Sequence, residues 1–279
     1  MKLAVLSDIH ANLPALEAVL ADIERWQPDH TIVAGDIINR GPRPAECLRL
    51  IEERVRGGWM ALRGNHEDYV LNVASYPDRM PQGIEGAVRA NVRWTLGQIG
   101  GLVSFIADLP DRIAFAAPDG SPVRVVHASM IHSRDCIFPE TGDDELRAKI
   151  APPPALFVCA HTHRPLIRQI DSALVVNVGA AGLPFDGDMR VSYGRLTWDG
   201  GWRAEIARVA YDRDRLEDDF VQSGYLSQNA AVASLVLDEF RRSLPRMGSW
   251  YDAYKEQVLA GELTVEESVE RILASVNGA

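Results

Sequence analysis

The stretch LFVCAHTHRP, residues 156–165, places two histidines, His161 and His163, directly after a short apolar run. Imidazole is a common metal ligand, and side chains two residues apart lie on the same face of an extended chain. The spacing therefore favours a chelating pair. A plainer interpretation is a buried core histidine followed by a solvated loop histidine, and other residues are needed to decide between the two.

Polar side chains follow the apolar runs elsewhere in the same way. The whole set comprises Asp8, His10, Asp36, Asn65, His66, His127, His161 and His163. Each has an alternative role: the aspartates could cap the helices that follow, Asn65 could be a turn residue, and His127 could be a buried histidine satisfied by backbone. Because open α/β sheets bind ligands at the carboxyl ends of their strands, we expect one shared site. His30 and His132 follow no such pattern, and we exclude them.

Short apolar runs alternate with amphipathic helical patterns in the first third of the chain. Residues 2–8, 30–36 and 59–65 predict strands, while residues 12–26 and about 44–55 predict helices whose apolar residues recur at helical spacing. Such alternation predicts a largely parallel sheet with crossover helices.

The rest of the chain divides into helical and strand-rich parts. A helical insertion is expected at about 67–109, followed by strands at 123–128, 156–161 and 173–179 and a hairpin that turns at Gly200-Gly201. After about Tyr211 the pattern is helical and contains none of the candidate ligands. We therefore expect one domain over residues 1–210 and a helical C-terminal extension over residues 211–279. The extension would pack on the core or on a second subunit, as in a homo-oligomer.

The composition narrows the classes of partner. A formal net charge of −10 argues against binding long nucleic acids, which requires clustered basic residues. The apolar run at the N-terminus is too short for a signal peptide and no stretch approaches a membrane span, so we expect a cytoplasmic protein and no membrane contact. Cys47, Cys136 and Cys159 are widely spaced, which predicts neither a disulfide framework nor a cysteine zinc site.

Five blocks of the chain together resemble the signature of the calcineurin-like metallophosphoesterases. They are D-I-H at 8–10, G-D at 35–36, G-N-H-E at 64–67, His127, and A-H-T-H at 160–163. The family usually has glycine where Ala160 stands, and alanine is small enough that we expect the turn to be kept. The resemblance implies an α/β fold, a two-sheet β sandwich flanked by helices in four layers (α/β-β/α).

The resemblance also implies a dinuclear metal centre. Asp8, His10 and His163 would hold the first ion, Asn65, His127 and His161 the second, and Asp36 would bridge both. Mixed nitrogen and oxygen ligands suit Mn, Fe, Zn or Ni better than Ca or Mg, and we expect two divalent ions, manganese first among them. Such a pair shares a hydroxide that attacks the phosphorus in line with the leaving oxygen.

Three further residues receive roles from the same resemblance. His66 resembles the family's general acid or charge stabiliser, and Asp68 is a candidate to orient it. Arg40 belongs to a G-D-x-x-x-R-G block like that of the protein-phosphatase and dinucleoside-tetraphosphatase branch, so it would clasp phosphate oxygens. The alternative is a surface arginine in a proline-rich turn. The candidate catalytic residues are therefore His66, Asp36 and Arg40.

The two motifs point to different substrates. S-D-I-H-A-N at 7–12 resembles the small bacterial phosphodiesterase branch, whereas the block around Arg40 resembles the other branch. We expect a dinuclear metal-dependent hydrolase of small phosphodiesters. The alternatives are a phosphomonoesterase or dinucleoside polyphosphate hydrolase and, from another class, a non-catalytic binding module on the same fold.

Overall fold

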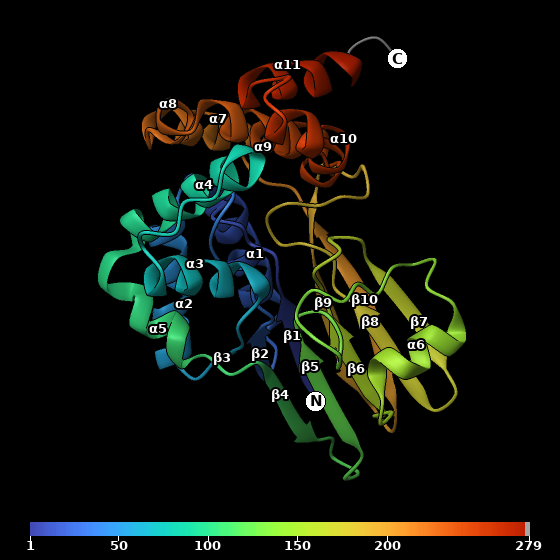
Figure 1. Cartoon of the computed structure of the whole chain (residues 1–279). Helices are drawn as coiled ribbons and strands as arrows, with labels where there is room; N and C mark the ends of the chain where they lie inside the picture. The colour runs from blue at the N-terminus through green and yellow to red at the C-terminus, as the bar shows by residue number, and fades with distance from the viewer. Residues whose placement is uncertain (277–279) are drawn as a thin grey trace.

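The computed structural model describes residues 1–276 and contains two five-stranded sheets packed face to face (Figure 1). The first sheet has the order β10-β9-β1-β2-β3, formed by Trp202–Val209, Val191–Trp198, Lys2–Leu6, His30–Val33 and Met60–Ala61. The second has the order β4-β5-β6-β8-β7, formed by Arg112–Ala116, Pro122–Val126, Leu156–Cys159, Ala173–Asn177 and Leu166–Ile170. The expected hairpin at Gly200-Gly201 is confirmed as β9 and β10.

Both sheets are mixed. β1, β2 and β3 run parallel in the first sheet, as do β5, β6 and β8 in the second. Antiparallel strands complete each sheet: β9 pairs with β1 through Val5 and Gly194, and β4 and β7 form the edges of the second sheet. The parallel arrangement expected for the first third of the chain is therefore confirmed by β1, β2 and β3, and later strands add antiparallel partners to both sheets.

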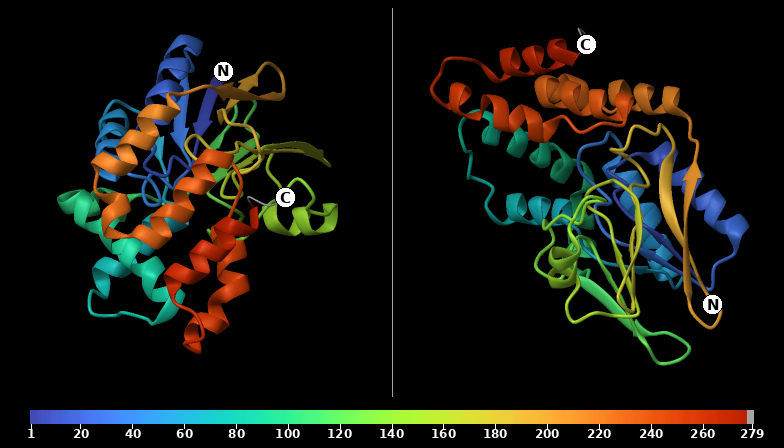
Figure 2. Two further views of the ribbon diagram at one scale, coloured as in Figure 1. Left: turned by 90° about the horizontal axis from the view of Figure 1, so that it is seen from above. Right: turned by 90° about the vertical axis from the view of Figure 1, so that its right-hand side faces the viewer.

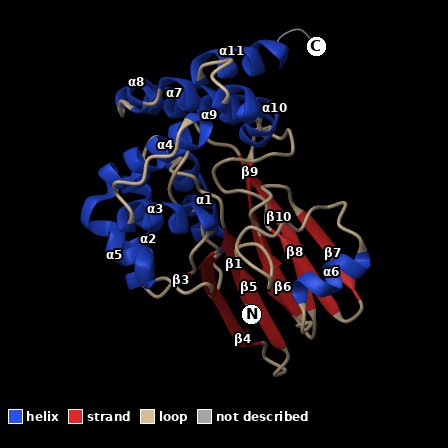
Figure 3. Ribbon diagram, viewed as in Figure 1, coloured by secondary structure: helices blue, strands red, loops and turns tan. Residues whose placement is uncertain are grey.

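Helices cover the outer faces of both sheets, so the sandwich has the four layers that the resemblance implied (Figure 3). The first sheet is covered by α1 (Leu13–Trp26), α2 (Pro44–Arg56), α3 (Asn65–Ser75), α4 (Gly83–Ile99), a 3₁₀ turn (Gly100–Leu102) and α5 (Val103–Asp108). The second is covered by α6 (Asp143–Ile150). Between the sheets lie fully buried aliphatic side chains such as Val5, Ile32, Val123 and Val158.

The C-terminal helices lie across the end of the sandwich opposite the N-terminus (Figures 1 and 2). They are α7 (Arg213–Gln222), α8 (Tyr225–Gln228), α9 (Ala230–Arg242), α10 (Met247–Leu259) and α11 (Val265–Val276). Their buried side chains, among them Trp250, Phe220 and Phe240, form one cluster with Ile84 and Trp94 of α4. The extension therefore packs on the core. Residues 277–279 lie outside the described part of the chain, and the domain division at residue 210 stays a prediction.

Two expectations drawn from composition can be compared with the structure. All three cysteines are free, and Cys47 and Cys159 are buried among apolar side chains. Over residues 1–276, no helix combines the length and the apolar character that crossing a membrane requires.

Candidate metal centre

The predicted ligands follow the carboxyl ends of β1, β2, β5 and β6 and the loop that connects β3 to α3, all at one end of the sandwich. β1 ends at Leu6 and β6 at Cys159, so the D-x-H and H-x-H pairs lie beyond the strands. Asp8, His10, Asp36, His161 and His163 all have left-handed backbone, with φ of 53°, 46°, 52°, 67° and 56°. The expectation that strand alternation aligns each pair is wrong, because these turns set the direction of the side chains. His161 and His163 accordingly enter different clusters.

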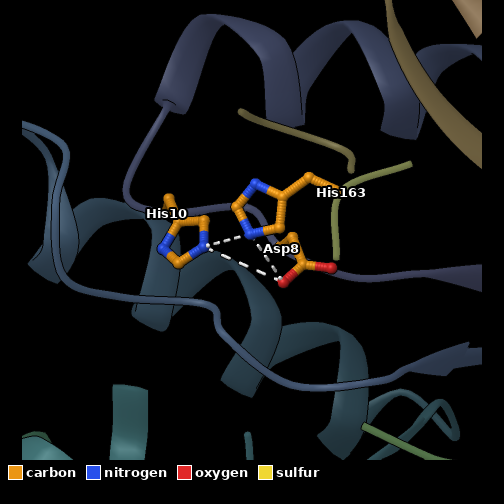
Figure 4. Close-up of side chains that lie close together, drawn as sticks. All are labelled: Asp8, His10 and His163. Atoms are coloured by element: carbon orange, nitrogen blue, oxygen red, sulfur yellow. Dashed lines mark hydrogen bonds and ion pairs between the residues drawn. The ribbon is translucent and has the colours of Figure 1, made fainter. Parts of the chain in front are cut away.

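The first cluster contains Asp8, His10 and His163 (Figure 4). The Nε2 atoms of His10 and His163 face each other at 3.2 Å, and Asp8 Oδ1 lies 3.8 Å from the first and 3.3 Å from the second. His10 and Asp8 are completely buried. Two imidazole nitrogens and a carboxylate oxygen thus converge on one point.

The second cluster contains Asp36, His127 and His161. Asp36 Oδ2 lies 3.3 Å from Nε2 of His127 and 3.7 Å from Nε2 of His10, so this one oxygen reaches both clusters. Asn65 adds its side-chain oxygen, 3.0 Å from His127 Nε2. The structure therefore brings together all seven residues that the sequence singled out as metal ligands.

Backbone carbonyl groups set the orientation of two of the imidazoles. His127 Nδ1 is 2.8 Å from the carbonyl oxygen of Ala34, and His163 Nδ1 donates to the carbonyl oxygen of Leu183. A proton held on Nδ1 in this way leaves the lone pair of Nε2 pointing into the cluster. Each ring is thus oriented so that its Nε2, when it carries no proton, can bind a cation.

Burial and neighbouring imidazoles lower the pKa of two of these histidines. Burial lowers the pKa of His161 to about 4, helped by His127, and holds the pKa of His10 well below its usual value, helped by His66 and His163. His127 is the exception: burial opposes its charge, but the carboxylate of Asp36 raises its pKa to about 10. The carboxylate of Asp36 thus stabilises positive charge placed beside it.

The residues present fit a pair of divalent cations. Asp8 Oδ1 is buried and has no hydrogen-bond partner, although burial of an unsatisfied carboxylate oxygen is costly. A cation between Asp8, His10 and His163 would satisfy it. The mixed nitrogen and oxygen donors are those of the borderline transition metals.

The interpretation of Asp8 and Asp36 as caps of the helices that follow them is wrong. Asn12 caps α1, accepting from the backbone N–H of Ala15 at 3.2 Å, and Arg43 precedes α2, so neither candidate aspartate is a helix cap. His30 and His132 are exposed and belong to neither cluster, as expected. Ala160 is buried with an ordinary negative φ, so this turn does not require the glycine usual in the family.

Glu67 is a buried structural residue to which the sequence assigned no role. Its carboxylate accepts from the backbone N–H groups of Asp36, Ile37 and Gly64 at 2.8, 2.8 and 2.9 Å, which ties the loop after β2 to the start of α3. The two loops approach so closely that a Cβ on Gly64 would lie 2.2 Å from Asp36 Oδ1. Burial and the charge of Asp36 raise the pKa of Glu67 to about 7. The sequence G-N-H-E, with a glutamate three residues after the residue that precedes the helix, is the pattern from which this capping role could have been predicted.

His66 lies beside the metal ligands and lines a cavity that is also lined by Asp36, Asn65 and His161. Its backbone N–H donates to Asp36 Oδ1 at 2.8 Å, and its ring meets that of His10 edge-on with centroids 4.7 Å apart. Asn39 Nδ2 lies 2.9 Å from His66 Nδ1. The suggestion that Asp68 orients this ring is wrong, because Asp68 pairs with Arg63 at 2.7 Å and points to the surface.

Arg40 is not a free arginine in a solvated turn, because it forms an ion pair with the C-terminal extension. Its Nη1 pairs with Glu239 Oε2 of α9 at 2.9 Å, and Glu239 is completely buried. Glu239 also accepts from the backbone N–H groups of Arg246 and Met247 at the start of α10. The C-terminal extension, which contains none of the candidate ligands, therefore contacts a candidate site residue directly.

Comparison with known proteins agrees with this geometry. A family model described as calcineurin-like phosphoesterase matches residues 1–180. An uncharacterized protein of Methanocaldococcus jannaschii is 29% identical over 241 residues, which cover 79% of this chain and 92% of that one. The crystal structure of a metallophosphoesterase from Sphaerobacter thermophilus has a TM-score of 0.65 and 26% identity, covering 83% of this chain and 100% of the other.

A hypothetical protein of Pyrococcus horikoshii shares the fold, with a TM-score of 0.73 at 18% identity and coverage of 88% of this chain and 99% of that one. The matched segment of the family model ends beyond the last candidate ligand, His163, so it contains the complete centre. Since all five motif blocks meet where a dinuclear site requires them, the chain belongs to the calcineurin-like phosphoesterase family of metal-dependent hydrolases.

Proposed function

We propose that this protein is a dinuclear metal-dependent phosphoesterase that hydrolyses small phosphodiesters. The observation that carries the proposal is the position of Asp36, whose Oδ2 lies within 3.7 Å of an imidazole nitrogen in each cluster. A carboxylate shared in this way is suited to bridge two cations a few ångströms apart.

The ligands divide between two ions in this proposal. Asp8, His10 and His163 would hold one, Asn65, His127 and His161 would hold the other, and Asp36 would contribute to both sites. Manganese is the expected metal, with iron, zinc or nickel as alternatives that the same donors accept. When bound, the two ions supply Lewis acidity that neutralises phosphoryl oxygens and acidifies a water molecule.

His66 is proposed to stabilise the charge that develops on the phosphoryl or leaving oxygen. Asn39 donates to its Nδ1, so the ring proton resides on Nε2. Burial lowers the pKa of His66 to about 3, so the free imidazole is neutral and offers this N–H as a hydrogen-bond donor. An anionic substrate beside it would favour the protonated form and allow proton donation.

Arg40 is proposed to contact the phosphate of the substrate. It lines the same cavity as His66, and the ion pair with Glu239 engages its Nη1, which leaves other N–H groups of the guanidinium for phosphate oxygens. Arg79 and Arg134 also line this cavity, and their guanidinium groups make no ion pair with any residue between 1 and 276. The cavity thus suits an anionic ester despite the net negative charge of the chain.

Further proposals concern the size of the substrate, the oligomeric state and the location of the enzyme. A cavity of about 720 Å³ suits a small ester better than a long nucleic acid. A homo-oligomer and a cytoplasmic location stay predictions of the sequence. A non-catalytic binding module is disfavoured because every ligand type expected of the family is present.

Elemental analysis and a substrate panel test the proposal together. Purified protein loaded with manganese is expected to hold close to two ions per chain and to hydrolyse bis(4-nitrophenyl) phosphate faster than 4-nitrophenyl phosphate or diadenosine tetraphosphate. Failure to retain any divalent ion would contradict the metal centre. Turnover of the monoester or tetraphosphate without detectable diester hydrolysis would support the alternative activities instead.

A further inference from the structure

The cavity above the candidate metal centre is walled by helices rather than by the sheets. Its base is formed by residues of the centre, including Asp36, Asn65 and His161. Its sides come from α4, α9 and α10, through Val88, Val92, Val232, Val236, Met247 and Tyr251. Figure 2 shows the C-terminal helices, in orange and red, lying over α4 at this end of the sandwich. The C-terminal extension thus forms part of the pocket above the reactive groups.

This helical wall offers a ligand apolar surface and few free polar groups. Its apolar members are four valines, a methionine and a tyrosine, and α4 also contributes Glu85, Arg89 and Asn91. The guanidinium of Arg89 bonds to Asn72 and to the carbonyl groups of Tyr76 and Arg79. The polar groups beside it already have partners within the protein: Asn91 donates to the hydroxyl of Tyr225 at 2.7 Å, and the hydroxyl of Tyr251 donates to Glu85 at 3.0 Å. Apolar ligand surface therefore gains more here than a hydroxyl-rich group does.

We propose that the helical wall binds the organic group of the phosphoester and that this group is apolar, an aryl group or a hydrocarbon of comparable size. The inference rests on the proposed function, since it takes the phosphate to lie on the metal centre. α9 and α10 then determine which esters are hydrolysed, and the seven candidate ligands determine the chemistry. A short polar alcohol would leave the wall exposed to water and would bind less tightly.

Gly248 provides a direct way to narrow the pocket. It lies in the first turn of α10, lines the cavity, and a Cβ built on it meets no atom within 4 Å. A phenylalanine at this position can therefore be accommodated at the edge of the cavity without displacing packed side chains. Gly97 of α4 is a matched control, because it is also an exposed helical glycine with open space around its Cβ but does not line the cavity.

The experiment compares two phosphonates that cannot be hydrolysed and that carry the same anionic head. Calorimetric titration of the manganese-loaded protein with naphthylmethylphosphonate and methylphosphonate gives the ratio of their dissociation constants. We expect the naphthyl compound to bind at least about tenfold more tightly, as burial of one ring system can provide. Gly248→Phe should reduce this preference by at least about tenfold, and Gly97→Phe should leave it unchanged. Met247→Gln, which makes the wall polar without adding bulk, should reduce it by a smaller factor.

The outcomes separate this inference from the proposed function. Equal binding of the two phosphonates to the unmodified protein, or an undiminished preference in a folded Gly248→Phe variant, overturns the inference while ester hydrolysis stands. If Gly248→Phe does not fold, Met247→Gln decides in the same way. Failure of both phosphonates to bind the metal-loaded protein overturns the inference, and with an inactive substrate panel it overturns the proposed function as well.

Discussion

Asn39 donates a hydrogen bond from its side-chain amide to Nδ1 of His66 over 2.9 Å. The oxygen of the same amide lies 3.2 Å from the hydroxyl of Thr95 in α4, which fixes the orientation of the amide. All three side chains are buried. A neutral chain of hydrogen bonds therefore fixes the orientation of the His66 ring and connects it to the helical insertion.

Replacing Asn39 should impair the positioning of His66 without affecting metal binding. Asn39→Leu keeps the size of the side chain but removes the donor, so we expect kcat to fall by about 10-fold to 100-fold while KM and metal content change little. Steady-state kinetics and elemental analysis measure the three quantities. Asn39→Gln, which keeps an amide donor for Nδ1, should recover part of kcat, and an equal loss in both variants would argue against positioning.

Replacing His66 by alanine tests whether it is a ligand or a group that acts on the substrate. His66 can form a third ligating group with His10 and Asp36, so geometry alone allows either role. We expect His66→Ala to retain close to two ions per chain and to lose about 10²-fold to 10⁴-fold in rate. A drop to one ion would mean that His66 is a ligand.

Asp36→Asn should weaken both ion sites together. The substitution keeps the shape of the side chain but removes the negative charge that reaches His10 and His127. We expect both ions to be lost in parallel during titration with a chelator, and turnover to be abolished. Asp68→Asn, which removes a surface carboxylate paired with Arg63, is the control and should retain both ions. Loss of a single ion from Asp36→Asn would exclude the bridging role.

Glu67→Gln should destabilise the protein more than its conservative nature suggests. The carboxylate accepts from four buried backbone N–H groups, and an amide would turn an N–H donor toward some of them. We expect the free energy of unfolding to fall by about 2–4 kcal/mol in urea denaturation. Glu53→Gln on the exposed face of α2 should change it by less than about 0.5 kcal/mol. A similar small change for Glu67 would contradict its structural role.

The sequence predicted those parts of the fold that a local pattern determines. The apolar runs of β1, β2 and β6 and the period of α1 identify these elements without reference to the rest of the chain. β4 and β7 escaped prediction, because both are edge strands whose alternating, half-exposed residues become strands only through pairing with β5 and β8.

The candidate site divides in the same manner. The sequence could predict that the side chains following buried strands meet at one site, since parallel strands bring their carboxyl ends to one edge of the sheet. The left-handed turns and the contacts of Asn39, Glu67 and Glu239 could not, since each depends on loops or helices that meet only in the folded chain. The link between Arg40 and Glu239 spans 199 residues and has no counterpart in any local pattern.

The left-handed backbone at Asp8, His10, Asp36, His161 and His163 has a consequence for how this chain can change over generations. Each such residue costs up to ~1–2 kcal/mol, an appreciable share of the net stability of a domain. Glycine or asparagine at the histidine positions would relieve part of that cost, so inactive variants should resist heat better than the active chain. In a gene copy no longer selected for catalysis, substitutions at these positions would therefore increase the stability of the fold while removing the activity.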